Sequence, residues 1–240
     1  MTHTPTHVRQ PLAEALVALA ETPDDVPGIA DDLQKVARLA ADRIAAVDYA
    51  AIVRRPDDGS CVVAASGDLV QGVDSVTRAA QDSMGPPDAC QSGAGTMSWP
   101  NFRDTATELG LGATSVPLFT GSGTAVASLD LYGRDPDRLA PLAAGIGAAY
   151  DPDLPWPEEC DDTRMCDAGC AELIAGFTEA LSVRQSIQLA VVLLGASEQT
   201  DPAEAYLKLR VRAAAEGLSL LAAASAVIAP TLAGPATGPD

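Results

Sequence analysis

The sequence is poor in histidine, and this shortage excludes a class of function. Of its 240 residues only two are histidines, His3 and His7, which lie next to the N-terminus. A Ser-His-Asp or Cys-His catalytic device therefore has no histidine available in the body of the chain. Glycine-rich phosphate loops of the P-loop or Rossmann type are also absent from the sequence. We therefore expect that the protein is not an enzyme.

Secretory features and long apolar runs are lacking as well. Residues 1–25 have no continuous apolar segment after a basic start, unlike a signal peptide. No run reaches the roughly 18 apolar residues that a membrane span needs. The five cysteines are an odd number in a long acidic chain, which is not typical of a secreted disulfide framework. These absences predict a cytoplasmic protein with no membrane partner.

Basic residues are scarce. The chain has 15 Lys and Arg against 33 Asp and Glu, for a net charge of −18. Such a chain repels phosphates as a whole, which argues against general binding to nucleic acids or anionic membranes. The charge is uneven, however, because residues 1–171 carry a net −15 and residues 172–229 only −2. An anionic partner would therefore have to bind the C-terminal part.

Two kinds of pattern divide the chain. Helical segments, among them 73–84 and 101–109, and two hairpin patterns, at 49–65 and 113–131, predict an α+β domain. In this domain helices cover one face of an antiparallel sheet. The pattern after this domain is purely helical. The predicted parts are an N-terminal tail and short helix (1–27), the α+β domain (28–150), a linker with prolines and cysteines (151–171), a three-helix domain (172–229) and a disordered tail (230–240).

Three stretches of the α+β domain carry a family resemblance. They are QDSMGPPDACQSG from Gln81, WPNFRDTATELGLGATSVPLF from Trp99 and VASLDLYGRDP from Val126. In this order they resemble the GAF domain of actinobacterial regulators, although Asp130 stands where that group usually has Asn. The resemblance implies a sensor whose small ligand binds between the sheet and a loop–helix segment. The candidate pocket residues are Gln81, Met97, Trp99 and Phe102, each of which also suits core packing.

The first helix of the C-terminal domain has a heptad pattern. Small or apolar residues recur at alternating steps of four and three, which predicts a two-stranded coiled coil and hence a homodimer. Arg184 completes the pattern, where a charged residue would set the register. The predicted seam residues are Leu173, Phe177, Ala180, Arg184, Ile187, Val191 and Leu194.

The second helix of this domain has start and stop signals. Asp201 is the expected N-cap, Pro202 suits the first helical position, and Glu204 can close a capping box. Gly217 is expected to end the helix, and a third helix is predicted at 218–228.

These helices resemble the ANTAR domain, an RNA-binding module of transcription antitermination regulators that often follows a GAF domain. The resemblance implies a dimer that binds RNA hairpins and reads their loops by stacking on an aromatic ring and by cations that meet phosphates. Matching positions are Arg184, Ile187, Ala190, Ala205, Tyr206, Leu209, Arg210, Ala213, Leu220, Ala224, Val227 and Ile228. The candidate RNA-binding residues are Arg184, Ala190, Ala205, Tyr206, Lys208, Arg210 and Arg212.

The same residues also allow a different interpretation. Tyr206 would be buried if it packed against the third helix, and Arg210 would be neutralised if it paired with Glu204 or Glu216. Val192 stands where the ANTAR pattern has glycine, and cations are few. These features favour a second hypothesis, a sensor and dimerisation protein with a degenerate RNA surface that acts through protein partners.

Three cysteines lie close together at the end of the predicted linker. Cys160, Cys166 and Cys170 provide thiols that in principle bind zinc or an iron–sulfur cluster, or act as a redox switch. Their spacing matches no standard ligand set, and no histidine is nearby. We therefore favour a solvated linker with incidental thiols, and predict no particular cofactor.

Overall fold

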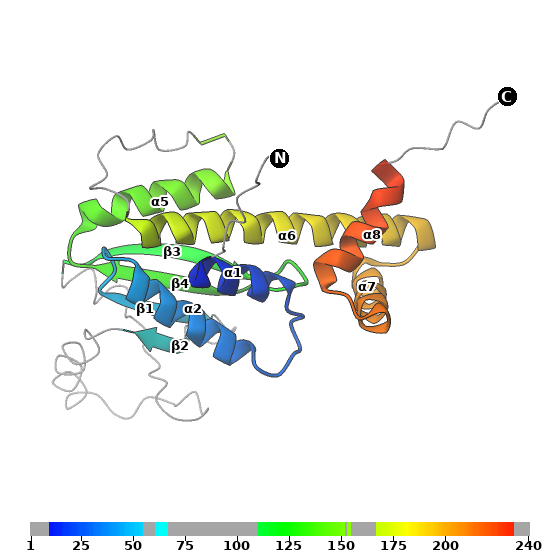
Figure 1. Cartoon of the computed structure of the whole chain (residues 1–240), viewed down its shortest axis with the longest axis horizontal. Helices are drawn as coiled ribbons and strands as arrows, with labels where there is room; N and C mark the ends of the chain where they lie inside the picture. The colour runs from blue at the N-terminus through cyan, green and yellow to red at the C-terminus, as the bar shows by residue number, and fades with distance from the viewer. Residues whose placement is uncertain (1–9, 55–60, 67–109, 152, 155–166, 233–240) are drawn as a thin grey trace, which may run out of the picture.

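The computed structural model describes residues 10–54, 61–66, 110–151, 153–154 and 167–232, with strand 61–66 described by its backbone only (Figure 1). The helices predicted at 73–84 and 101–109 lie outside these residues. In chain order the elements are α1 (Pro11–Glu21), α2 (Ile29–Arg43), β1 (Tyr49–Arg54), β2 (Cys61–Ser66), β3 (Gly112–Phe119), β4 (Ala125–Gly133), α5 (Pro136–Tyr150), α6 (Ala168–Glu198), α7 (Pro202–Glu216) and α8 (Leu220–Leu232).

The four strands form one antiparallel sheet in the order β2-β1-β4-β3. Leu129 of β4 lies opposite both Ile52 of β1 and Val116 of β3, so the three side chains share one face of the sheet. All three are fully buried in a cluster that also contains residues of α1, α2, α5 and α6. The predicted α+β arrangement, with helices on one face of an antiparallel sheet, is confirmed for the described elements.

A second hydrophobic cluster joins the C-terminal half of α6 to α7 and α8. Its centre contains Ile187 and Ala190 of α6, Leu209 of α7 and Ala223 of α8. We call residues 183–232 the helical module, and the sheet with α1, α2, α5 and residues 168–182 the α+β body. Helix α6 runs without a break from the body into the module, where α7 and α8 pack against its far end (Figure 1).

The N-terminal half of α6 is anchored in the body by a buried carboxylate. Glu172 is 6% exposed, and its Oε1 accepts a hydrogen bond of 2.6 Å from the backbone N–H of Leu12 at the start of α1. Its Oε2 accepts a hydrogen bond of 2.6 Å from Nε of Arg43 at the end of α2. A carboxylate at a helix N-terminus is favourable because it meets unpaired N–H groups and the positive end of the helix dipole. Glu172 therefore links α1, α2 and α6.

A close approach of two helices strengthens this anchor. A Cβ atom added to Gly176 of α6 would lie 2.5 Å from Cα of Ala13 in α1, a distance that real Cβ atoms essentially never show. Glycine is therefore required for α1 and α6 to pack at this separation. The predicted N-terminal helix is confirmed in position, and it is a core helix that contacts both clusters through Leu16 and Val17.

The predicted linker at 151–171 extends too far towards the C-terminus. Helix α6 begins at Ala168, because the Asp167 side chain accepts a 2.8 Å hydrogen bond from the backbone N–H of Cys170 and so caps the helix. Cys170 is 1% exposed in the body core, which contradicts a place on a solvated linker. Cys160 and Cys166 lie outside the described residues. Within the part that the structure describes, no group of three His, Cys, Asp or Glu side chains is placed to hold a metal.

Residues of the predicted coiled-coil seam pack against other helices of the same chain. Leu173, Phe177, Ala180 and Ile187 are 5% exposed or less, and they pack in the two clusters of the same chain. The heptad spacing correctly indicated that this face of α6 is buried. It was wrong about the partner, because α1, α7 and α8 cover the face that was assigned to a second copy.

Helix α6 has the length and composition of a membrane-spanning helix, which was not predicted from the sequence. By length and composition it is long and apolar enough to cross a membrane, and the bent pair of α7 and α8 would be a second candidate if it formed one span. Leu173, Phe177 and Ile187 of α6 pack in the chain's own clusters. Burial in the protein core accounts for part of this apolar composition, because 28% of the most apolar 18-residue window of α6 is buried.

Candidate nucleic-acid interface

Helix α7, which carries most of the candidate RNA-binding residues, begins and ends as predicted. The Asp201 side chain accepts a 2.9 Å hydrogen bond from the backbone N–H of Glu204, and Pro202 occupies the first helical position. Gly217 ends the helix at φ +63°, in the left-handed region that favours glycine. The caps fix which residues of α7 face the body and which face away.

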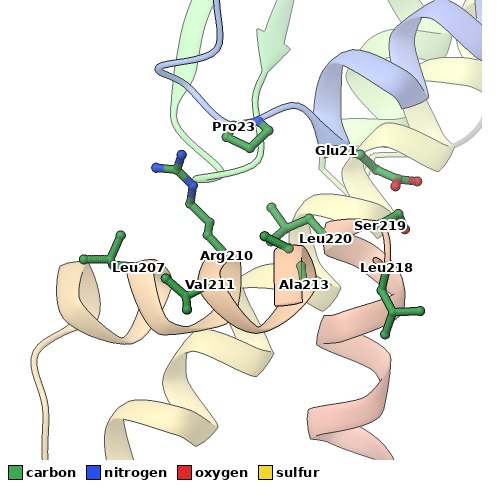
Figure 2. A pocket seen from close by; sticks show the side chains of 10 residues that line it. Glu21, Pro23, Leu207, Arg210, Val211, Ala213, Leu218, Ser219 and Leu220 are labelled. Carbon is green, nitrogen blue, oxygen red and sulfur yellow. The ribbon is translucent and has the colours of Figure 1, made fainter. Parts of the chain in front are cut away.

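One face of α7 contacts the α+β body. Nη2 of Arg210 lies 2.7 Å from Oδ1 of Asp25, in the connector (residues 22–28) between α1 and α2. Figure 2 shows the Arg210 side chain extending from α7 towards Pro23 of this connector. Arg210 therefore pairs with neither Glu204 nor Glu216, the two partners considered from the sequence. Asp25 was missed there because no local pattern connects it with α7.

Tyr206 lies on the same face and is half-buried. Its hydroxyl is buried and has no hydrogen-bond partner among the described residues. It lies beside Gly121 of the β3–β4 turn (residues 120–124), where an added Cβ would be 3.1 Å from the hydroxyl oxygen. Burial, followed by the negative charge of Asp24, raises the pKa of Tyr206 to about 12. The phenol is therefore neutral at physiological pH, and its polar end faces the body rather than solvent.

Arg184 of α6 also contacts the β3–β4 turn. Its Nε donates a 2.7 Å hydrogen bond to the backbone carbonyl of Gly123. The guanidinium carbon lies 4.5 Å from the ring centroid of Phe119, a cation–π geometry. Arg184 is thus neither in a coiled-coil seam nor on a free surface. Its guanidinium already contacts two groups of the body, the Gly123 carbonyl and the Phe119 ring.

The other cations of α7 point away from the body. Nζ of Lys208 lies 2.6 Å from Glu198 and 3.2 Å from Glu204, and hydrogen bonds to these carboxylates raise the pKa of the lysine. Arg212 forms a 3.0 Å pair with Glu216 one turn further along. The Lys208 and Arg212 side chains are 39% and 45% exposed, so both ion pairs lie at the surface. They form the more accessible half of the predicted interface.

Two of the candidate residues do not reach the surface at all. Ala190 of α6 and Ala205 of α7 are both 0% exposed. Ala190 belongs to the module cluster, and Ala205 faces α6 where its Cβ lies 3.8 Å from the position of a Cβ on Gly195. Their small side chains allow the helices to approach, so the prediction of direct RNA contact by these two residues is wrong.

An apolar surface on α7 was not predicted. Leu207, Val211 and Leu218 are 54%, 61% and 41% exposed. With Pro23 and Leu220 they line a surface cleft of about 470 Å³ between α7 and the connector (Figure 2). The four-residue spacing of Leu207 and Val211 was present in the sequence as a signal of one helical face, whereas Leu218 follows the end of α7.

The four predicted ligand-pocket residues, Gln81, Met97, Trp99 and Phe102, lie outside the described residues. The sheet face opposite the helices carries a buried polar group instead. Asp130 is 6% exposed and accepts hydrogen bonds from the hydroxyls of Ser115 and Tyr132. This carboxylate stands where the GAF pattern usually has asparagine.

No family model, curated protein or solved structure matches this chain. The GAF and ANTAR resemblances therefore stay predictions from sequence motifs. The geometry of α7 has to be interpreted from its own contacts.

These contacts define what the interface can do chemically. Each of the four cations, Arg184, Lys208, Arg210 and Arg212, has a carboxylate or carbonyl partner within hydrogen-bond distance. An anionic ligand must therefore replace an existing partner. Exchange of a carboxylate for a phosphate preserves the charge-assisted hydrogen bonds, so such a replacement is chemically conservative.

Proposed function

We propose that this protein is a cytoplasmic, signal-responsive RNA-binding regulator that acts in transcription antitermination. In this proposal the helical module binds hairpin RNA, and the α+β body is a sensor that controls the module. The observation that carries the proposal is the composition of one helix. Helix α7 places Tyr206, Lys208, Arg210 and Arg212 at or near the surface of the least acidic part of the chain.

The physical requirements of RNA recognition support this assignment. Sequence-specific RNA binding targets loops, whose bases stack on aromatic rings while cations contact the backbone. Stacking contributes about 1–3 kcal/mol per base in comparable systems, so a single tyrosine whose ring reaches the RNA matters. Lys208 and Arg212 are one turn apart on an exposed face and suit a phosphate backbone. The resemblance to ANTAR domains supports hairpin RNA as the ligand.

A homodimer in this proposal needs a surface other than the heptad stripe. Large apolar side chains remain exposed on the outer side of α6 and on α7. Those on α6 are Leu189, 47% exposed, and Val192, 65% exposed. We propose that two copies pair through these exposed residues of the module, and sedimentation of the full chain would detect the pair.

RNA binding is tested by gel shift with a pool of two-hairpin RNAs whose loops are randomised. We expect micromolar or tighter binding at low salt and weaker binding at physiological salt, because phosphate contacts release counterions. The double variant Lys208→Glu, Arg212→Glu should weaken binding at least tenfold. It removes two surface cations and leaves the buried residues of α7 unchanged.

A matched control separates this effect from total charge. The double variant Arg134→Glu, Arg138→Glu changes the net charge equally, and both side chains are exposed on the α+β body. It should bind the same RNA as well as the unchanged protein. Absence of binding by the unchanged protein at micromolar concentration, at both salt concentrations, would overturn the proposed function.

A second candidate function is favoured by the apolar cleft on α7. Leu207, Val211 and Leu218 are exposed together, whereas every cation of the module is already paired. These features suit a sensor whose RNA-binding surface is degenerate and which acts by binding a protein partner. In that case the Lys208→Glu, Arg212→Glu variant would keep full regulatory output in cells, and the Val211→Asp variant would lose it.

A further inference from the structure

We propose that the α+β body holds the module in an autoinhibited position, in which Asp25 occupies the place of an RNA phosphate on Arg210. This inference rests on the proposed RNA-binding function and adds how that function is controlled. It starts from the two segments of the body that touch α7, the connector (residues 22–28) and the β3–β4 turn (residues 120–124).

The connector and the turn are fixed to each other. The backbone N–H of Gly121 donates a 2.8 Å hydrogen bond to the carbonyl of Thr22. The carboxylate of Asp24 accepts hydrogen bonds from the Thr120 hydroxyl and from the backbone N–H of Ser122. The two segments therefore move as one platform, and the turn connects the platform directly to β3 and β4 of the sheet.

This platform contacts three of the RNA-binding candidates, Tyr206 and Arg210 of α7 and Arg184 of α6. Asp25 of the platform forms an ion pair with the guanidinium of Arg210, and Gly121 lies next to the hydroxyl of Tyr206. The carbonyl of Gly123 accepts a hydrogen bond from Nε of Arg184. The aromatic residue and two of the four cations of the module are thus partly covered by the body, while Lys208 and Arg212 are not.

The contact that Asp25 makes with Arg210 resembles the contact that an RNA phosphate would make with this arginine. The Asp25 carboxylate oxygen lies 2.7 Å from Nη2 of Arg210, a distance typical of a charge-assisted hydrogen bond to a carboxylate or a phosphate. The Arg210 guanidinium also lies 5.8 Å from the ring centroid of Tyr206. A base that stacks on this ring and a phosphate on this arginine would need the space that the platform fills. RNA and platform therefore compete for one face of α7.

The contact between the platform and α7 has features that favour opening. Asp25 is 66% exposed, so solvent screens its ion pair with Arg210. A surface cleft separates much of α7 from the connector, so the packing between them is incomplete (Figure 2). The buried Tyr206 hydroxyl has no hydrogen-bond partner among the described residues, and opening would give it one in water. A signal that shifts the platform would release this face.

Two variants should open the contact by different means. Asp25→Asn removes the charge that holds Arg210. Gly121→Val adds a side chain whose Cβ would lie 2.7 Å from Cδ2 of Leu220 and 3.2 Å from the Thr22 carbonyl, so it pushes the module away without a change of charge. Neither residue belongs to the proposed RNA surface.

The matched controls are Asp32→Asn and Gly147→Val. Asp32 is exposed on α2, and a Cβ on Gly147 would meet only Leu154, at an ordinary 3.6 Å. Each protein is tested as the full chain with the randomised two-hairpin RNA pool. Small-angle scattering without RNA reports whether the module has moved away from the body.

If the closed state is ten times more populated than the open state, opening raises the apparent RNA affinity about tenfold. We expect an increase of up to about fourfold for Asp25→Asn, because an exposed ion pair contributes at most about 1 kcal/mol. We expect the full increase of about tenfold for Gly121→Val, a larger radius of gyration for both variants, and no change for either control. Binding by the unchanged protein with the same affinity as both opened variants would overturn autoinhibition and leave the proposed function intact. Absence of RNA binding by every protein, opened variants included, would overturn the proposed function and this inference with it.

Because Gly121→Val also lies in the β3–β4 turn, a loss of folding in that variant has to be distinguished from opening. Asp25→Asn then decides the result alone, because Asp25 is exposed and contributes no core contact. An unchanged affinity in Asp25→Asn, beside an unchanged scattering profile, would count against the proposal.

Discussion

Helix α6 joins the two parts of the molecule, and its two halves are held in different ways. Its N-terminal half is fixed by the buried Glu172 carboxylate and by the close approach at Gly176. Its C-terminal half carries a module that meets the body through an exposed ion pair at Asp25 and beside an open cleft. Buried charges without partners are costly, whereas exposed pairs contribute little. We call these two sets of contacts joints. The joint at Glu172 and Gly176 is therefore the stronger one, and the joint at Asp25 is suited to opening.

The largest effect that separates the two joints should come from Glu172. We expect Glu172→Ala to lower the free energy of unfolding by about 2–4 kcal/mol, because it leaves N–H groups of α1 and Nε of Arg43 without their partner. Glu216→Ala removes an exposed pair with Arg212 and should cost less than about 1 kcal/mol. Denaturant unfolding of both variants measures the difference, and equal costs would contradict the comparison.

The next effect concerns the two close glycines. Gly176→Val should lower the free energy of unfolding by about 1–3 kcal/mol, because the backbone of α1 must move to admit a side chain. Gly121→Val should cost less than that, because the nearest atom is the end of the flexible Leu220 side chain and the module can move away. Thermal and denaturant unfolding would detect the order, and a larger cost for Gly121→Val would reverse our assignment of the weaker joint.

A smaller effect is expected at the ion pair itself. In a double-mutant cycle with Asp25→Asn and Arg210→Gln, we expect a coupling free energy of about 0.2–1 kcal/mol, as for other exposed pairs. The four proteins are compared by denaturant unfolding at low salt. Coupling well above this range would show that the module is held too firmly for the platform to act as a switch.

The last effect is confined to alkaline pH and does not appear at physiological pH. The pKa of Tyr206 is raised from its ordinary value of 10 to about 12 in the folded chain, chiefly by burial. The neutral phenol therefore contributes stability that is present below pH 10 and is lost as the pH rises from 10 to 12. The unchanged protein should lose more stability than Tyr206→Phe over this interval. Parallel unfolding curves for the two proteins would show that the hydroxyl is not buried in solution.

Sequence patterns predicted elements whose signals are local. The caps Asp201 and Gly217 set the limits of α7, and the two hairpins were found from alternating apolar strands and turn residues. These features depend on backbone conformation within a few residues, so a single sequence contains the information.

Contacts between distant segments were not predictable in the same way. The heptad stripe of α6 was recognised as a buried face, but periodicity does not say what covers it. Helix α1 was predicted as a short helix outside the α+β domain, so its packing against α6 was not foreseen. Arg210 and Asp25 were both visible as charged residues, yet nothing in the chain between them indicates that they meet. Ala190 and Ala205 were assigned to RNA from a motif match, although small residues at such positions also serve helix packing.

The continuity of α6 has a practical consequence for experiments on fragments. A fragment that begins at residue 172 would lose the Asp167 cap and helix α1, and Leu173, Phe177 and Ala180 would face water. Because these side chains repeat at heptad spacing, two such fragments would adhere along them. Self-association of an excised module would then be an artefact of severing the helix, and the oligomeric state has to be determined on the intact chain.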